Sequence, residues 1–270
     1  YPETAFRHTG IDPITGGKFE VNVPRWLYRG EAGCWPATNS SMERVKSRQH
    51  PVFAGLPPRV HNDFAQAVEA IALSACSELE KWLGLGQMQA AGLAQHYGLP
   101  TEFLDVTSSL AVATAFAVGE LSSWTAPKRV LFAVIDMRRA IEHCTVADLA
   151  SMIEVARRPA AQHAYGFWHK NHRNLKDPDC IADVGVRWHE ILVHPEDACR
   201  HAAIPELLDA HKDRAAGGLQ LILDDIAKGH QKWPDELANF LSSTVAAAPF
   251  ITRVVRWEGS RPAEVELVSA

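Results

Sequence analysis

Hydrophobic residues recur at two periods along this chain, and each period predicts a different kind of element. Residues 61–83 carry apolar side chains at spacings of three and four, which is the period of a helix with one buried face. Residues 130–136 form a nearly continuous apolar run rich in β-branched side chains, which is typical of a buried strand. The same patterns predict helices at about 88–97, 109–118, 206–211 and 219–228, and strands at about 25–30, 103–106, 188–193, 250–257 and 265–268.

Polar and turn-forming residues separate these elements. Residues 1–25 are expected to be an extended lead-in with turns at Asp12-Pro13 and Gly16-Gly17. Residues 31–60 contain four prolines and are expected to be loop. Helices and strands mix without a regular strand–helix–strand alternation, which favours an α+β fold over a doubly wound parallel sheet.

Length and charge restrict the class of protein only loosely. The 270 residues are enough for one large domain or two small ones. A net charge of -5 argues against a protein that coats nucleic acid, although a local basic cleft stays open. No apolar run is long enough to span a bilayer, and residues 1–20 lack the order of a signal peptide. We therefore expect no membrane association and a cytoplasmic protein.

Cysteine and histidine spacing predicts neither a disulfide framework nor a metal site. The cysteine count is odd and no pair has CxxC spacing, so reduced thiols are expected. None of the thirteen histidines stands in HxH or HExxH spacing with a carboxylate, so no metal site is predicted. The five cysteines are Cys34, Cys76, Cys144, Cys180 and Cys199.

Two segments carry residue types suited to binding an anion or a sugar. In the first, Arg29 ends a predicted strand and precedes Gly30, so a guanidinium could grip phosphate where a ligand approaches the backbone. The alternative is a salt-bridging arginine beside a turn. The second segment, residues 93–110, gathers His, Tyr, Asp, Thr and two Ser between a turn and a predicted helix. One of these hydroxyls, or Asp105, is expected to cap that helix.

Together the two segments resemble the FRG domain, a family named for a Phe-Arg-Gly motif. Tyr28 stands where the name has Phe. The family's longer signature is matched by residues 95–101, 104–107 and 113–117, with Val106 in place of Trp and Glu102 in place of Arg. A looser match follows at residues 158–162 and 166–167. The resemblance covers about residues 25–195, and it divides the chain into a lead-in at 1–25, an FRG domain at 26–200 and an extension at 201–270.

The order of motifs also looks like that of arginine-type ADP-ribosyltransferases. Residues 28–30 resemble their aromatic-Arg-Gly strand, and Thr107 to Ser109 resemble their Ser-x-Ser strand end. The third motif, Glu-x-Glu before a strand, is matched only in its second Glu, at Glu190. Gln162 is the competing candidate, because the FRG pattern has Gln there. The resemblance implies mixed, mostly antiparallel central sheets with flanking helices.

The resemblance implies an enzyme that consumes NAD, either transferring ADP-ribose to a protein, DNA or RNA acceptor or hydrolysing NAD. A carboxylate near the ribose would stabilise the cation formed there, and Glu190 and Gln162 are the two candidates for that catalytic position. Arg29 would anchor the pyrophosphate. Tyr97 or Phe116 would stack on nicotinamide. The implied NAD-contacting residues are Tyr28, Arg29, Gly30, His96, Tyr97, Thr107, Ser108, Ser109 and Phe116.

The transferase resemblance also implies a toxin or phage-defence effector, with an antitoxin as partner.

Two other functions stay open from the sequence. The first alternative is a non-catalytic FRG module that binds a nucleotide or nucleic acid, which the incomplete Glu-x-Glu motif favours. The second is a nuclease built on the histidine-rich segments, which would need a metal cluster that the spacing does not predict.

Overall fold

The structure is a computed structural model that describes most of the first 194 residues and a few short stretches beyond them. The described residues are 5–11, 18–49, 58–118, 126–171, 174–194, 215, 217–219, 221–223, 257–258 and 261–262. The helix predicted at 206–211, the strand predicted at 265–268, and most of the elements predicted at 219–228 and 250–257 lie outside these residues.

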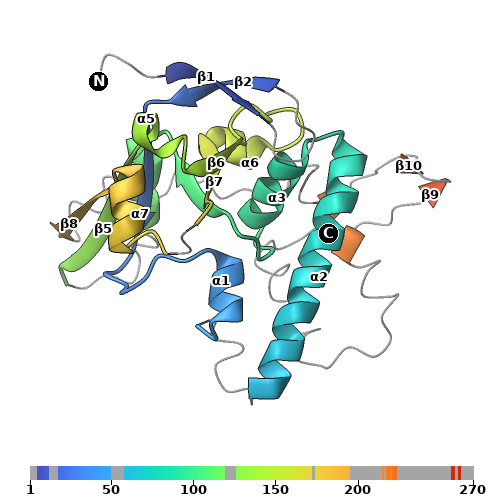
Figure 1. Ribbon diagram of the computed structural model, residues 1–270, viewed down its shortest axis with the longest axis horizontal. Coiled ribbons are helices and arrows are strands. Elements are labelled where there is room, and N and C mark those ends of the chain that lie inside the picture. Colours follow the sequence, from blue (N-terminus) through green and yellow to red (C-terminus); the bar gives the residue numbers. More distant parts are fainter. Residues whose placement is uncertain are drawn as a thin grey trace. The chain divides into compact units, whose positions relative to one another are not determined.

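Helices and strands are interleaved along the chain (Figure 1), and the α+β prediction is confirmed at that level. The strands are β1 Ala5–Ile11, β2 Lys18–Pro24, β3 Trp26–Glu31, β4 Leu104–Thr107, β5 Lys128–Asp136, β6 Cys144–Asp148, β7 Ala164–His169, β8 Arg187–Val193, β9 Trp257–Glu258 and β10 Arg261–Pro262. The helices are α1 Ser41–Lys46, α2 Pro58–Leu83, α3 Gln87–His96, α4 Leu110–Val118, α5 Met137–Ala140, α6 Arg157–Ala161 and α7 Pro178–Val184.

Six strands form the main sheet, in the order β6-β7-β4-β3-β5-β8. The pairs β3–β4, β3–β5 and β5–β8 are antiparallel. Two further pairs, β1–β2 and β9–β10, are antiparallel ribbons. The predominance of antiparallel pairing fits chain connections that seldom return by a long parallel crossover.

The chain divides into two compact units. The first, here called the sheet unit, comprises Tyr1–Thr38, Val106–Val146 and Trp168–Ile204; the second, here called the helical unit, comprises Asn39–Asp105, Ala147–Phe167 and Pro205–Ala270. The chain passes from one unit to the other within β4, β6 and β7. The division interleaves segments of sequence, and the boundaries predicted at residues 25 and 200 stay predictions.

In the sheet unit, helix α4 packs directly on one face of β3 and β5. Ala113 and Ala117 of α4 are fully buried against Val130 and Phe132 of β5. A Cβ atom on Gly30 of β3 would lie 1.8 Å from the carbonyl oxygen of Ala113, so only glycine permits this approach. The alanine-rich sequence of α4 and the glycine of β3 together set how closely helix and sheet meet.

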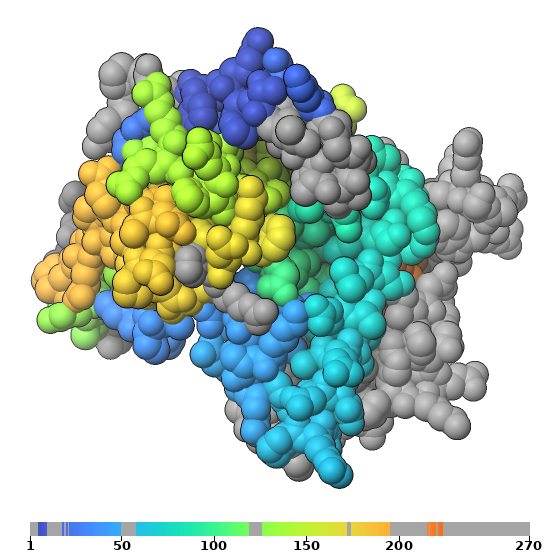
Figure 2. All heavy atoms as spheres, in the orientation of Figure 1, coloured from blue at the N-terminus to red at the C-terminus, as the bar shows by residue number. Residues whose placement is uncertain are grey.

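In the helical unit, the long helix α2 packs against α3 and α1. Figures 1 and 2 show α1 and α2 side by side, in blue and cyan. The buried face of α2 carries Phe64, Val68 and Ile71 at the predicted spacing. His61, 1 % exposed, contacts the Val45 carbonyl oxygen through Nε2 at 2.6 Å, which ties the start of α2 to α1.

The expectations about the first sixty residues differ in their outcome. The lead-in is extended as expected, and its two halves pair as a β ribbon, Ala5–Ile11 with Lys18–Pro24; the turns predicted at 12–13 and 16–17 lie outside the described residues. The segment expected to be loop contains α1, whose N-cap Ser40 accepts a hydrogen bond from the Glu43 amide, and it also includes the first turn of α2 from Pro58. A helix of six residues carries too few hydrophobic repeats to be recognised from periodicity.

Candidate functional site

Arg29 lies in β3, between β4 and β5, with a side chain 20 % exposed. The strand register places Arg29 opposite Ala133 of β5, and Ala133 opposite Trp188 of β8. Residues directly opposite one another in a sheet project from the same face. Arg29 and Trp188 therefore share a face of the sheet, two strands apart.

Beside Arg29 on the same face lies a buried carboxylate, Glu31, with a side chain 5 % exposed. Its Oε1 accepts hydrogen bonds from Arg29 Nε at 3.3 Å and from Thr38 Oγ1 at 2.9 Å. Its Oε2 accepts one from Lys176 Nζ at 3.2 Å. Burying a carboxylate is costly unless cations and donors surround it, and here three groups do so. We call Arg29, Glu31 and Lys176 the Glu31 cluster.

Lys176 is fixed by contacts on several sides. Its ammonium also donates to the Trp35 carbonyl oxygen and lies 4.7 Å from the ring centroid of Trp188, a cation–π contact. The Asn174 side chain accepts from the amides of Thr38 and Lys176, which holds the turn before α7. The Trp188 indole nitrogen is buried and has no hydrogen-bond partner among the described residues.

Glu190 projects from the same face as Arg29. The register runs from Glu31 through Leu131 to Glu190, which places the two carboxylates two strands, or roughly 10 Å, apart. The Glu190 side chain is 47 % exposed and its Oε1 accepts a hydrogen bond from Arg129 Nη1 at 2.6 Å. This face of the sheet thus carries an arginine, an indole ring and a half-exposed carboxylate.

The predicted hydroxyl motif projects from the other face. Thr107 lies opposite Tyr28, so its side chain shares Tyr28's face and not that of Arg29. Thr107 Oγ1 accepts from the Ser109 amide at 3.0 Å, and Ser109 Oγ accepts from the Val112 amide at 3.3 Å. Ser109 therefore caps α4, as one of the hydroxyls was expected to do. Ser108, half-buried, follows the end of β4.

Tyr28, Gly30 and Phe116 belong to the contact between β3 and α4. Tyr28 packs against the cluster formed by Ala113 and Ala117. The expectation that a ligand approaches the backbone at Gly30 is wrong on this face, because α4 occupies the space beside it. Phe116, in contrast, is 43 % exposed on α4.

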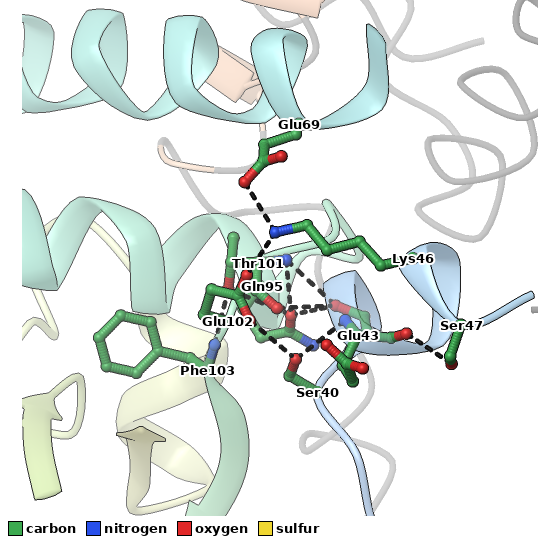
Figure 3. Close-up of polar contacts among 10 residues, drawn as sticks. Ser40, Glu43, Lys46, Ser47, Glu69, Gln95, Thr101, Glu102 and Phe103 are labelled. Atoms are coloured by element: carbon green, nitrogen blue, oxygen red, sulfur yellow. Dashed lines mark hydrogen bonds and ion pairs between the residues drawn. The ribbon is translucent and has the colours of Figure 1, made fainter. Parts of the chain in front are cut away.

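In the helical unit, the longest sequence motif builds a polar network around Gln95 (Figure 3). Gln95 Oε1 accepts hydrogen bonds from Ser41 Oγ at 2.5 Å and from the Thr101 amide and hydroxyl at 3.2 Å each. Three donors on Oε1 fix the orientation of the amide, so its Nε2 donates to Asp105 Oδ2 at 3.4 Å. Gln95 thereby joins α1, α3 and the start of β4.

Lys46 bridges two carboxylates next to this network, as Figure 3 shows. Its ammonium lies 2.7 Å from Glu69 of α2 and 2.9 Å from Glu102. Burial lowers the pKa of Lys46, but the hydrogen bonds to Glu69 and Glu102 outweigh burial, so the pKa is raised above its usual value. Glu102, which departs from the FRG pattern, is thus matched with a lysine of α1.

The remaining predicted site residues of the helical unit are deeply buried. His96, whose side chain is 5 % exposed, has Nδ1 3.8 Å from Asp105 Oδ1, and its Nε2 finds no hydrogen-bond partner in the part of the chain that the structure describes. Tyr97 is 6 % exposed and meets the His96 ring edge-on at 5.7 Å. Gln162 is 1 % exposed at the C-cap of α6. The predicted NAD-contacting roles of His96 and Tyr97, and the predicted catalytic role of Gln162, stay predictions.

The described residues were also searched for metal-binding groups, free thiols and helices that could span a membrane. Among them, no group of three or more His, Cys, Asp and Glu side chains could hold a metal ion. Cys34, Cys76, Cys144 and Cys180 are free thiols, and burial raises the pKa of the last three to about 12. In the part of the chain that the structure describes, no helix has the length and apolar character needed to cross a membrane.

The structure defines a mixed α+β protein whose main sheet displays Arg29, Trp188 and Glu190 on one face. The family model of the FRG domain matches residues 24–124, from the last residue of β2 to beyond α4. This match supports the FRG resemblance for the segment that holds Arg29, the Gln95 network and the α4 cap. No curated protein matches the chain, and no solved structure matches it.

Several residues of these clusters were missed from sequence alone. Glu31 stands two residues after Arg29, and that spacing in a strand could have predicted a shared face. Lys176 and Trp188 carry no comparable signal, because 145 residues separate Lys176 from its partner Glu31. These two residues, like Glu190, also lie outside the segment that matches the FRG domain.

Proposed function

We propose that the protein is an ADP-ribosyltransferase-like enzyme that binds NAD and either transfers ADP-ribose to a macromolecular acceptor or hydrolyses NAD. One observation carries the proposal: Arg29 and Glu190 project from the same face of three antiparallel strands, and Trp188, across β5 from Arg29 and two residues before Glu190, shares that face. A cation suits the pyrophosphate, an indole ring suits the nicotinamide or adenine, and a carboxylate suits the developing cation on the ribose.

In the proposed reaction, the bond between nicotinamide and the ribose C1′ breaks, and its electron pair leaves with nicotinamide. Glu190 stabilises the positive charge that develops on the ribose, and an acceptor atom or water then bonds to C1′ and loses a proton. Arg129, 2.6 Å from Glu190, fixes the position of that carboxylate. Arg29 holds the diphosphate, so the ribose is oriented by a fixed part of the substrate.

The proposal is tested by measuring nicotinamide released from NAD by the full chain, with protein, DNA and RNA acceptors each supplied. Arg29→Ala is expected to abolish NAD binding, because it removes the phosphate anchor. Glu190→Gln is expected to keep binding and lose turnover by a hundredfold or more, roughly the loss typical of one charge-stabilising group. Glu142→Gln, an exposed glutamate of the sheet unit, serves as the control.

Gln162→Ala decides between the two catalytic positions. Loss of turnover in Gln162→Ala with normal turnover in Glu190→Gln would transfer the role to Gln162. Gln162 is 1 % exposed, so thermal unfolding must first show that the Gln162→Ala variant is folded before its turnover is compared with that of wild type.

A second candidate, a non-catalytic module that binds a nucleotide or nucleic acid, is favoured by one observation. Trp188 occupies the position where a Glu-x-Glu motif would have its first carboxylate, and the second, Glu190, is paired with Arg129. Wild-type protein that binds NAD or an oligonucleotide, yet releases no nicotinamide with any acceptor, would establish this candidate instead.

A further inference from the structure

Strand β8 ends the main sheet, and within the described residues no strand pairs with its outer edge (Figure 1). On its inner side it pairs with β5 over seven consecutive residues, without a bulge. Five of the seven residues of β8 are exposed, whereas none of the five residues of β6, the strand at the other end of the sheet, is exposed. The accessible edge of this sheet is therefore that of β8.

The side chains of β8 make this edge suited to pairing with another strand. Ile191 and Leu192 are 45 % and 56 % exposed and project from opposite faces, so apolar surface flanks the edge on both sides. Proteins protect open edges with lysine, proline, bulges or very short strands, and β8 has none of these. Its carboxylate, Glu190, is paired with Arg129 of β5. Unpaired backbone donors and acceptors between apolar side chains form a template for a further strand.

The sequence of β8 favours a second copy of the same strand, running antiparallel about a two-fold axis. Pairing centred on Glu190 would place two carboxylates opposite one another, and pairing centred on His189 would oppose two imidazoles. Pairing centred on Ile191 opposes two isoleucines, and it sets Glu190 against Leu192 and His189 against Val193 of the other copy. This register brings no like charges into opposition, and a shift further along the strand would pair fewer residues.

We propose that the protein forms a two-fold dimer in which β8 pairs with β8 of a second copy, in the register centred on Ile191. A second copy covers the edge permanently, and two-fold pairing uses both open edges, so assembly stops at the dimer. A partner bound only in passing would leave the edge open to indiscriminate pairing. In this dimer, Leu192 of the second copy lies across from Glu190, so the second copy borders the proposed catalytic carboxylate.

The test is sedimentation velocity of the full chain over a dilution series, without a nucleotide. At the higher concentrations, wild type is expected at about twice the 29.7 kDa mass of one chain. Ile191→Lys puts two lysines opposite one another and removes apolar contact from both copies, so the dissociation constant should rise about a hundredfold or more. Leu73→Lys, at a 63 % exposed position of α2, is the control and should dimerise as wild type does.

Two substitutions of Leu192 test the register. Residue 192 faces Glu190 of the second copy, so Leu192→Lys creates two opposite-charge pairs and Leu192→Glu creates two like-charge pairs. Both variants lose the same apolar contact, and we expect Leu192→Glu to dimerise about tenfold more weakly than Leu192→Lys. Thermal unfolding checks that each variant is folded. Should Ile191→Lys fail to fold, the comparison of the two Leu192 variants decides.

Hydrogen exchange of the β8 amides identifies any other occupant of the edge. A monomer with protected β8 amides would mean that another segment of this chain covers the edge, and a monomer with unprotected amides would leave the edge to a different protein. Either result overturns the inference. A dimer that Ile191→Lys leaves intact, or equal dimerisation of the two Leu192 variants, overturns it as well. Nicotinamide release is measured separately, so the proposed enzyme activity and the dimer can each fail alone.

Discussion

The sheet unit and the helical unit each contain a polar cluster, and the two clusters are built in opposite ways. The Glu31 cluster assembles three charged groups, Arg29, Glu31 and Lys176, from distant parts of the chain. The Gln95 network joins mostly neutral groups of a short motif to Ser41 of α1 and to the Asp105 carboxylate, and the acceptor Gln95 Oε1 receives three donors. A cluster of charged groups on a sheet face can attract a ligand of opposite charge, whereas a network whose groups satisfy one another mainly stabilises a fold.

The two clusters also show that a sequence motif can mark either residues that stabilise the fold or residues of a proposed binding face. Residues 95–105 form the part of the chain that most resembles the FRG signature, yet Gln95 and Thr101 bind one another and the start of α1. Arg29 belongs to a much shorter motif, and its partners come from outside it. The specific motif thus explains how the helical unit is held together, and the weaker one marks the proposed binding face.

Gly30→Ala is expected to have the largest effect, and it is confined to the sheet unit. The added Cβ would lie 1.8 Å from the Ala113 carbonyl oxygen, so α4 must move away from β3. We expect a loss of about 3 kcal/mol or more in the free energy of unfolding, measured by urea titration. Gly33→Ala is the matched control, since the atoms nearest its Cβ would be those of the exposed Trp35 ring, at 3.3 Å. Equal stability of the two variants would contradict the described contact of α4 with β3.

Gln95→Leu is expected to have the next largest effect, this time on the helical unit. It removes the acceptor of Ser41 and Thr101 and one donor to Asp105, at a cost of roughly 2–3 kcal/mol in the free energy of unfolding. Gln87→Leu, at an exposed position of the same helix, should change stability little. If Gln95→Leu has the same free energy of unfolding as wild type but loses ADP-ribose binding, the Gln95 network serves ligand binding and not stability, and the comparison of the two clusters is wrong.

Alkaline pH is expected to have a smaller effect per residue, and it acts on both units. Burial raises the pKa of Cys76, Cys144 and Cys180 to about 12, so the folded protein keeps these protons while the unfolded chain releases them. The unfolded state then binds fewer protons, and stability falls as pH rises above the thiols' unperturbed pKa. The loss is about 1.4 kcal/mol per thiol one pH unit above that value.

Urea titrations at neutral and alkaline pH measure this slope, and Cys180→Ala should make it shallower. Lys46, whose raised pKa stabilises the folded state until pH exceeds that pKa, adds a loss of the same sign only at still higher pH. Cys34→Ala, which removes an exposed thiol, is the matched control for the substitution itself. A slope that Cys180→Ala leaves unchanged would mean that this thiol ionises in the folded protein.

The sequence by itself predicted the elements that are long or strongly patterned. The helical period of α2 and the apolar run of β5 were recognised because each repeats over many residues. The capping hydroxyl of α4 was expected for a local reason, the preference of the first turn for a nearby oxygen. The α+β class followed from the order of such elements, whereas the short helices α1 and α6 and the ribbon β1–β2 gave too little repeat to be recognised.

Only the tertiary structure decided which of the predicted site residues share a face. Strand register places Arg29 with Trp188 and Glu190, and it places Thr107 with Tyr28 on the other side, because a shift of one residue reverses the face. Periodicity reports that a residue is in a strand but not which residue lies opposite. The pairing of Glu31 with Lys176, 145 residues away, is likewise a contact that no local pattern encodes, because long-range contacts arise only when the chain folds.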